Sequence, residues 1–304
     1  PWQDAEYYYC WEIKKLAYWF DYTWNDISNY TLAGHFSLGY SLIALLAELI
    51  FPQNAVVLHS FNIVLAIISG VCLYRILALI YPQMKNNTKA IFTSVYLFSP
   101  WILGFIGFFN IDVPSIYFFV IWISCVLHGK KLLQTVFAFL FIFTKEPSIV
   151  YFAFACLGII IADYICNKTN NSTNIFLFVL NQIKKFVFEI IIASLWLISF
   201  VIRLKSGSNW GGDVFNSDKK MHCFGLSWWN IDLKFKGIFL INFSWIILLI
   251  IIIAMIIKIF SRKKAINYEK CIDTYAMTYY RCVIRSTFIG FLLFNMLYID
   301  LQHP

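Results

Sequence analysis

The sequence predicts an all-α fold, a polytopic bundle of about eight transmembrane helices with juxtamembrane helices in its first outer loop. Hydrophobic residues make up 61% of the 304 residues and charged residues only 13%, whereas soluble domains carry about a quarter charged residues. The apolar residues form runs of about 17–23, the length that crosses a bilayer core as a helix. Runs such as Ile246–Ile257 lack the alternation that a membrane β-barrel requires.

Residues 1–57 are expected to form an outer loop. Within it, residues 4–17 can form an amphipathic helix that lies in the membrane interface, with Trp and Tyr rings at headgroup level. Residues 36–51 are apolar, but the run is short and contains Glu48. A juxtamembrane or re-entrant helix is therefore predicted there rather than a full span.

The remaining chain is predicted to form one membrane domain, residues 1–304 as a whole, without an internal repeat. Residues 58–165 provide its core spans, and residues 166–304 add further spans and a second outer loop, 203–237. Full spans are expected at 58–81, 90–108, 113–128, 132–145, 147–165, 186–202, 238–260 and 283–299. The 132–145 run is short and could pair with 147–165 as a broken hairpin.

The two ends of the chain are abrupt. It begins with Pro1 rather than Met and stops at His303-Pro304 without a polar tail. We expect a fragment of a longer protein, in which a first helix precedes Pro1 and further sequence follows Pro304.

The basic residues predict the orientation. If the loops after residues 81, 128, 165 and 260 face the cytoplasm, fifteen of the 24 Lys and Arg residues lie on that side. Twelve of the sixteen Asp and Glu residues then lie on the outer side. The expected location is the bacterial plasma membrane, with the functional residues on its outer face. Nothing in the chain resembles a nucleic-acid-binding module, so the bilayer is the expected partner rather than DNA or RNA.

Asp112 is the single most informative position, because it places one acid in a very short outer turn between two predicted spans. A carboxylate near hydrocarbon costs up to about 3 kcal/mol, and it persists most easily where it faces a water-filled cavity. The alternative is a helix cap, since Asp112 before Val113-Pro114 matches an N-cap followed by proline in the first turn.

A second acidic candidate is the pair Asp4 and Glu6, at the start of the predicted interfacial helix. Two carboxylates this close could bind a divalent cation such as Mg²⁺ or Mn²⁺, or one could act as a general base. An acid pair at a helix start can equally interact with the helix dipole alone.

Lys145 is the cationic candidate, next to Glu146 at an apolar boundary. A buried lysine needs a partner, which could be Glu146 or a substrate phosphate. Otherwise its amine would extend to the lipid headgroups. His35 and His303 carry no separate signal.

Several short motifs occur along the chain in an order that resembles a known family. The motifs are an acidic motif before tyrosines, a His-containing juxtamembrane segment, Ser-Pro before an Asp-x-Pro turn, a Thr-Lys motif and a late His-Pro. In chain order they read Asp4-Ala5-Glu6-Tyr7-Tyr8, Gly34-His35-Phe36-Ser37-Leu38-Gly39-Tyr40, Ser99-Pro100, Asp112-Val113-Pro114, Thr144-Lys145-Glu146-Pro147 and His303-Pro304. Their order is similar to that in the GT-C superfamily of membrane glycosyltransferases. The nearest group is the dolichyl-phosphate-mannose protein mannosyltransferase-like enzymes of glycosyltransferase family 39, which include aminoarabinose transferases and Rgt-type relatives.

The resemblance is clearest over residues 1–165. The chain departs from the family in having Phe36-Ser37 where the family often has Pro-Pro, and in having Asp-x-Glu rather than adjacent acids.

The resemblance implies a glycosyltransferase that moves a sugar from a polyprenyl-phosphate donor to a lipid, glycan or protein acceptor outside the cytoplasm. It implies Asp4 as the general base, with Glu6 and Asp112 as helpers or metal ligands. It also implies Lys145, and His303 with His35, at the substrate. Direct displacement of this kind inverts the anomeric centre.

Other functional classes remain open. A lipid-linked sugar flippase or transporter would use charges within its spans and often shows paired repeats. An O-antigen ligase or polymerase would rely on a large outer loop rich in Arg and His. A purely structural membrane subunit is the remaining alternative.

Overall fold

The computed structural model describes residues 17, 37–52, 54–99, 102–103, 112–168, 175–206, 222–224, 227–236, 252, 256 and 274–300. These residues are helical except for short connections and one pair of three-residue strands. The strands, β1 (His222–Phe224) and β2 (Tyr298–Asp300), pair antiparallel, and neither was expected from the sequence.

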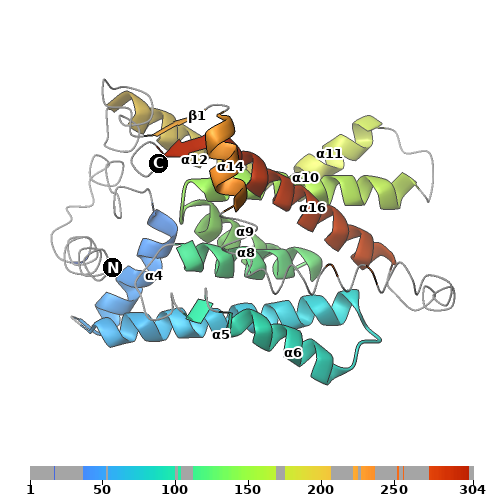
Figure 1. Ribbon diagram of the computed structural model, residues 1–304, viewed down its shortest axis with the longest axis horizontal. Helices are drawn as coiled ribbons and strands as arrows, with labels where there is room; N and C mark the ends of the chain where they lie inside the picture. The colour runs from blue at the N-terminus through green and yellow to red at the C-terminus, as the bar shows by residue number, and fades with distance from the viewer. Residues whose placement is uncertain are drawn as a thin grey trace.

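The described helices are labelled in chain order in Figure 1. They are α4 (Leu38–Ile50), α5 (Ala55–Ile80), α6 (Asn86–Leu97), α8 (Asp112–Leu127), α9 (Lys131–Ile142), α10 (Pro147–Lys168), α11 (Ile175–Lys185), α12 (Val187–Ser206), α14 (Trp228–Lys236) and α16 (Thr274–Leu297). The prediction of an all-α membrane protein is thus confirmed at the level of fold class.

The described residues bear out the predicted number of membrane spans only in part. Three helices, α5, α10 and α16, contain segments long and apolar enough to cross a membrane, or four spans result if the bent pair α11–α12 counts as one. The helix α8 has 16 residues and α9 has 12, so each is shorter than a full span. The predicted 238–260 span lies outside the described residues except at Ile252 and Ile256, which are helical.

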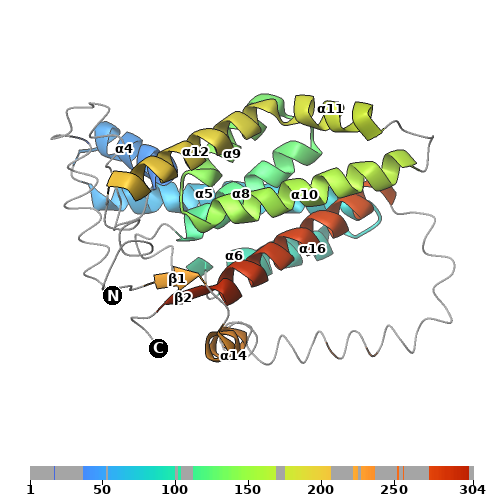
Figure 2. The same cartoon turned by 90° about the horizontal axis from the view of Figure 1, so that it is seen from above.

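The long helices lie side by side in the two views (Figures 1 and 2). Small residues let α10 and α16 approach closely: a Cβ added at Gly158 would lie 2.7 Å from the Cys282 oxygen. The Ser286 hydroxyl of α16 also donates to the Phe154 carbonyl of α10, at 2.5 Å. Small side chains and inter-helix hydrogen bonds are the usual means of helix association in lipid, where apolar surfaces gain little by meeting each other.

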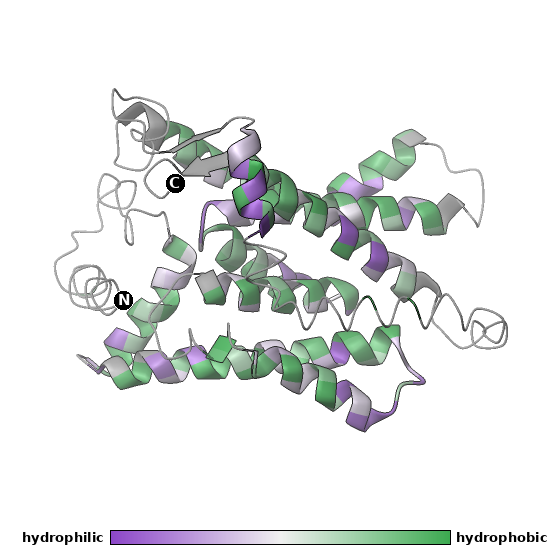
Figure 3. Ribbon diagram, in the orientation of Figure 1, coloured by the Kyte–Doolittle hydropathy of each residue, from purple (hydrophilic) through white to green (hydrophobic). Residues whose placement is uncertain are grey.

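Several polar side chains inside the bundle pair across helices, and many large apolar side chains of its helices are exposed. Figure 3 shows that apolar residues predominate along the helices. Tyr40 of α4 donates to Asn62 of α5 at 2.7 Å, and Ser69 of α5 shares a 2.6 Å hydrogen bond with Tyr96 of α6. Exposed side chains include Ile67 at 54% and Leu197 at 51%. This arrangement suits a hydrocarbon solvent, because an unpaired polar group there costs several kcal/mol.

The bundle has two chemically different ends. At one end lie the first turns of α8 and α10 and the turn between α9 and α10; we call it the cavity end. The opposite end holds an ion pair between Lys185 and Asp163 at 2.5 Å, and Gln134 donates to the buried Glu189 at 2.7 Å. There the chain bends by 72° between α11 and α12. The helix α11 was not predicted.

Candidate functional site

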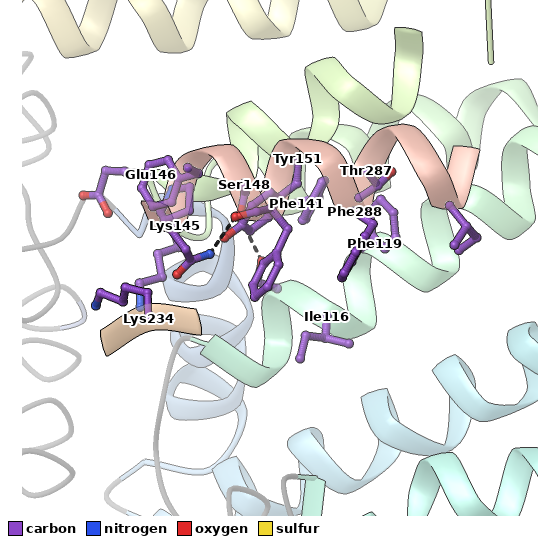
Figure 4. A pocket seen from close by; sticks show the side chains of 16 residues that line it. Ile116, Phe119, Phe141, Lys145, Glu146, Ser148, Tyr151, Lys234, Thr287 and Phe288 are labelled. Carbon is purple, nitrogen blue, oxygen red and sulfur yellow. Dashed lines mark hydrogen bonds between the residues drawn. The ribbon is translucent and has the colours of Figure 1, made fainter. Parts of the chain in front are cut away.

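A cavity of about 680 Å³ lies at the cavity end, between α8, α9, α10, α14 and α16. Its volume falls within the range of about 300–1,000 Å³ typical of small-molecule sites. Figure 4 shows the side chains that line it. Lining residues come from helices more than 150 positions apart in sequence, such as Ser115 of α8 and Asn295 of α16. The tertiary packing of the bundle therefore creates the site.

Six of the sixteen described residues that line the cavity are aromatic. Phe119 and Phe141 approach to 5.2 Å between ring centroids on one side. Tyr151 lies 5.9 Å from Phe291 and 6.1 Å from Phe294 on another. Rings of this kind present large apolar faces with little conformational freedom to lose. This part of the cavity is suited to a hydrocarbon chain.

One end of the cavity is cationic. Lys145, in the turn between α9 and α10, and Lys234, on α14, both line it, and Figure 4 shows them near each other at the end away from Phe119 and Phe288. Glu146, 6% exposed, also belongs to the lining. Among the described lining residues, two ammonium groups and one carboxylate give this end a net positive charge.

Two helix N-termini add to that positive potential. Ser115, in the first turn of α8, and Ser148, in the first turn of α10, line the cavity and share a 2.8 Å hydrogen bond. The helix α10 begins at Pro147, the position where proline is best tolerated. Each N-terminus carries the equivalent of about half a positive charge on unpaired N–H groups. An anion at this end of the cavity would be stabilised by both.

The cavity also contains polar groups along its α16 wall. The Thr287 hydroxyl is buried and has no hydrogen-bond partner among the described residues. Asn295, nearer the end of α16, donates to the Phe291 carbonyl at 2.8 Å. An unpaired buried hydroxyl costs about 1–3 kcal/mol, so a ligand oxygen that reached Thr287 would recover part of that cost.

The start of α4 supports the turn that carries Lys145. The Gly39 N–H donates to the Phe143 carbonyl at 2.8 Å. A Cβ at Gly39 would collide with the Leu140 carbonyl, so only glycine fits this contact. The preceding Ser37 is fully buried and its hydroxyl has no partner among the described residues. Two motifs that lie about 100 residues apart in sequence, around Gly39 and around Lys145, therefore touch.

The structure locates two of the residues singled out from the sequence. Lys145 lines the cavity. Asp112 is the first residue of α8, one turn before Ser115, so its backbone lies at the same end of the bundle as Lys145; its side chain lies outside the described part. Asp4, Glu6, His35 and His303 lie outside the described residues.

Sequence reasoning missed other lining residues: Ser115, Ser148, Lys234, Thr287 and Asn295. The sequence predicts an outer loop around Lys234, because its nine-residue helix, α14, is too short and too mixed in polarity to be recognised. Ser115 and Ser148 each follow a proline at a predicted span start, and that shared position was the available signal.

The metal site predicted at Asp4 and Glu6 lies outside the described residues. Within the described ranges, no three His, Cys, Asp or Glu side chains gather closely enough to hold a metal ion.

Comparison of the chain with models of known protein families, with curated proteins and with solved structures gives no match.

Proposed function

We propose that the chain is a membrane glycosyltransferase that moves a sugar from a polyprenyl-phosphate donor to an extracytoplasmic acceptor, with inversion at the anomeric carbon. The observation that carries the proposal is the cavity, which combines aromatic walls with Lys145 and two helix N-termini at one end. A polyprenyl phosphate has the matching chemistry, an unsaturated hydrocarbon chain that ends in an anion.

In this proposal Lys145 assists the reaction as well as the binding of the donor. The donor is a phosphodiester with one negative charge, and its phosphate gains a second when the bond to the sugar breaks. A cation at Lys145 therefore interacts more strongly with the departing phosphate than with the bound donor. Interactions that strengthen in this way accelerate the chemical step rather than merely improving binding.

The proposed transfer reaction also requires a base. The acceptor oxygen attacks the anomeric carbon, the bond from that carbon to the phosphate oxygen breaks, and the acceptor hydroxyl proton passes to a base. We assign the base to Asp4, because it opens the acidic motif in which the chain resembles GT-C enzymes. The leaving group departs as polyprenyl phosphate and needs no general acid.

Other parts of the proposal follow the same resemblance. They are a GT-C-like bundle of about eight spans with its site on the outer face of a bacterial plasma membrane, helper or metal-binding roles for Glu6 and Asp112, and contacts from His35 and His303 to the substrate. A divalent cation would be held by Asp4 and Glu6, and no step above depends on it.

A transfer assay tests the proposal. The full chain would be reconstituted in proteoliposomes with a panel of radiolabelled polyprenyl-phosphate hexoses and a membrane extract as acceptor. We expect label to leave the polyprenyl fraction for at least one donor, with an equal amount of polyprenyl phosphate released.

A flippase would give a different result in the same vesicles. The label would cross from one leaflet to the other while it stayed attached to the lipid, and no polyprenyl phosphate would form. Intact donor across the whole panel would reject the transferase assignment.

A further inference from the structure

The short helix α14 has an unusual distribution of side chains. Its large apolar side chains face outward, with Trp228 84% exposed, Trp229 50%, Leu233 41% and Phe235 49%. Tryptophan and other aromatic side chains exposed in this way are common where a protein meets the lipid headgroup region. The outward face of α14 therefore needs no protein partner.

The inward face of α14 is polar instead. It carries Asn230 and Lys234 beside the apolar Ile231, with Ser227 just before the first helical residue, and a spacing of three and four residues places them on one side of a helix. Asn230 is 1% exposed, and its amide donates to the Met296 carbonyl near the end of α16 at 3.0 Å. That hydrogen bond explains one inward polar residue and fixes α14 against α16.

The other inward polar residue of α14 is Lys234, and no partner among the described residues accounts for its position. It is half-buried, it lines the cavity, and it makes no hydrogen bond or ion pair among the described residues. The neighbouring Lys236 behaves differently, since it is exposed and pairs with Asp232 four residues earlier, at 2.5 Å. A lysine turned inward without a carboxylate partner is costly unless an anion joins it.

We infer that Lys234 is a second cation for the anionic headgroup, which α14 carries into place beside Lys145. The inference rests on the proposed function, because the headgroup in question is the phosphate of the polyprenyl donor. Asn230 is then a positioning residue: it holds α14 on α16 so that Lys234 reaches the cavity. Two ammonium groups from different elements can bind different oxygens of one phosphate, which fixes its orientation as well as its position.

Binding of farnesyl phosphate, compared with the neutral analogue farnesol, tests the inference on the purified full chain. We expect Lys234→Ala to weaken farnesyl phosphate binding by about three- to tenfold and to leave farnesol binding unchanged. Lys236→Ala is the matched control, because it removes the same charge from the same helix two residues away. It should bind both ligands as the unmodified protein does.

A variant of Asn230 tests its positioning role separately. Asn230→Leu should weaken farnesyl phosphate binding about as much as Lys234→Ala, and the double variant should lose little more, because Asn230 acts through Lys234. Additive losses would mean that Asn230 acts separately and would overturn its positioning role.

The outcomes also separate this inference from the proposed function. Equal affinities for Lys234→Ala and Lys236→Ala, with phosphate still preferred over alcohol, would overturn the role of Lys234 alone. An unmodified protein that bound farnesyl phosphate no better than farnesol would overturn both.

Discussion

Sugar transfer by the Asp4→Asn variant is expected to be at least about a hundredfold slower than by the unmodified protein, because a positioned general base contributes factors of about 10²–10⁴. Asparagine keeps the size and the hydrogen-bonding oxygen of the side chain but cannot accept the acceptor's proton at neutral pH. The measurement is the initial rate of polyprenyl phosphate release in proteoliposomes, at saturating donor.

Two controls make that result specific. Binding of polyprenyl phosphate to Asp4→Asn should stay unchanged, since the phosphate is held by cations rather than by the base. Asp26→Asn, which alters another acid of the same outer segment, should transfer sugar at the normal rate. Full activity of Asp4→Asn would remove Asp4 from the mechanism.

The second large effect is expected at Lys145. A hydrogen bond to a charged partner contributes about 1.5–3 kcal/mol, so Lys145→Ala should weaken farnesyl phosphate binding by about 10- to 150-fold. The catalytic rate constant should fall as well, because charge on the phosphate grows as the sugar leaves. Equilibrium binding and transfer rates, measured on the same preparation, separate the two contributions.

The chain offers a matched control for this variant. Lys130 is exposed and immediately precedes the opposite end of α9, so Lys130→Ala removes the same charge at the far end of the bundle. It should bind and transfer normally. Unchanged affinity of Lys145→Ala for farnesyl phosphate, or an equal loss of farnesol binding, would show that Lys145 does not act on the phosphate.

The helices that could be predicted from the sequence are those whose signal is a continuous apolar run. Residues 58–81 and 147–165 correspond to α5 (Ala55–Ile80) and α10 (Pro147–Lys168), which agree with the predictions to within three residues at each boundary. Membrane helices are predictable in this way because hydrocarbon penalises every unpaired backbone group. The bend between α11 and α12 could not be predicted, since neither composition nor proline marks Phe186.

The candidate site was predictable only where an unusual residue stood out against an apolar background. Lys145 was found because a lysine at a span boundary requires a partner. Thr287 and Asn295 were not, because isolated polar residues on a long helix give no sign of which face meets a cavity. The role of Lys234 could be predicted only with the knowledge that its side chain faces inward on α14. That orientation depends on the contact between Asn230 and Met296.

Photo-labelling is the most direct test of the central claim that the cavity holds the lipid donor. The probe would be a polyprenyl phosphate with a diazirine within its hydrocarbon chain, and the labelled sites would be mapped by mass spectrometry. We predict labels on Phe119, Phe141, Tyr151, Phe288 and Phe291, which excess unlabelled polyprenyl phosphate abolishes. Labels confined to lipid-facing residues such as Ile190 and Leu197 of α12, insensitive to that competitor, would contradict the account.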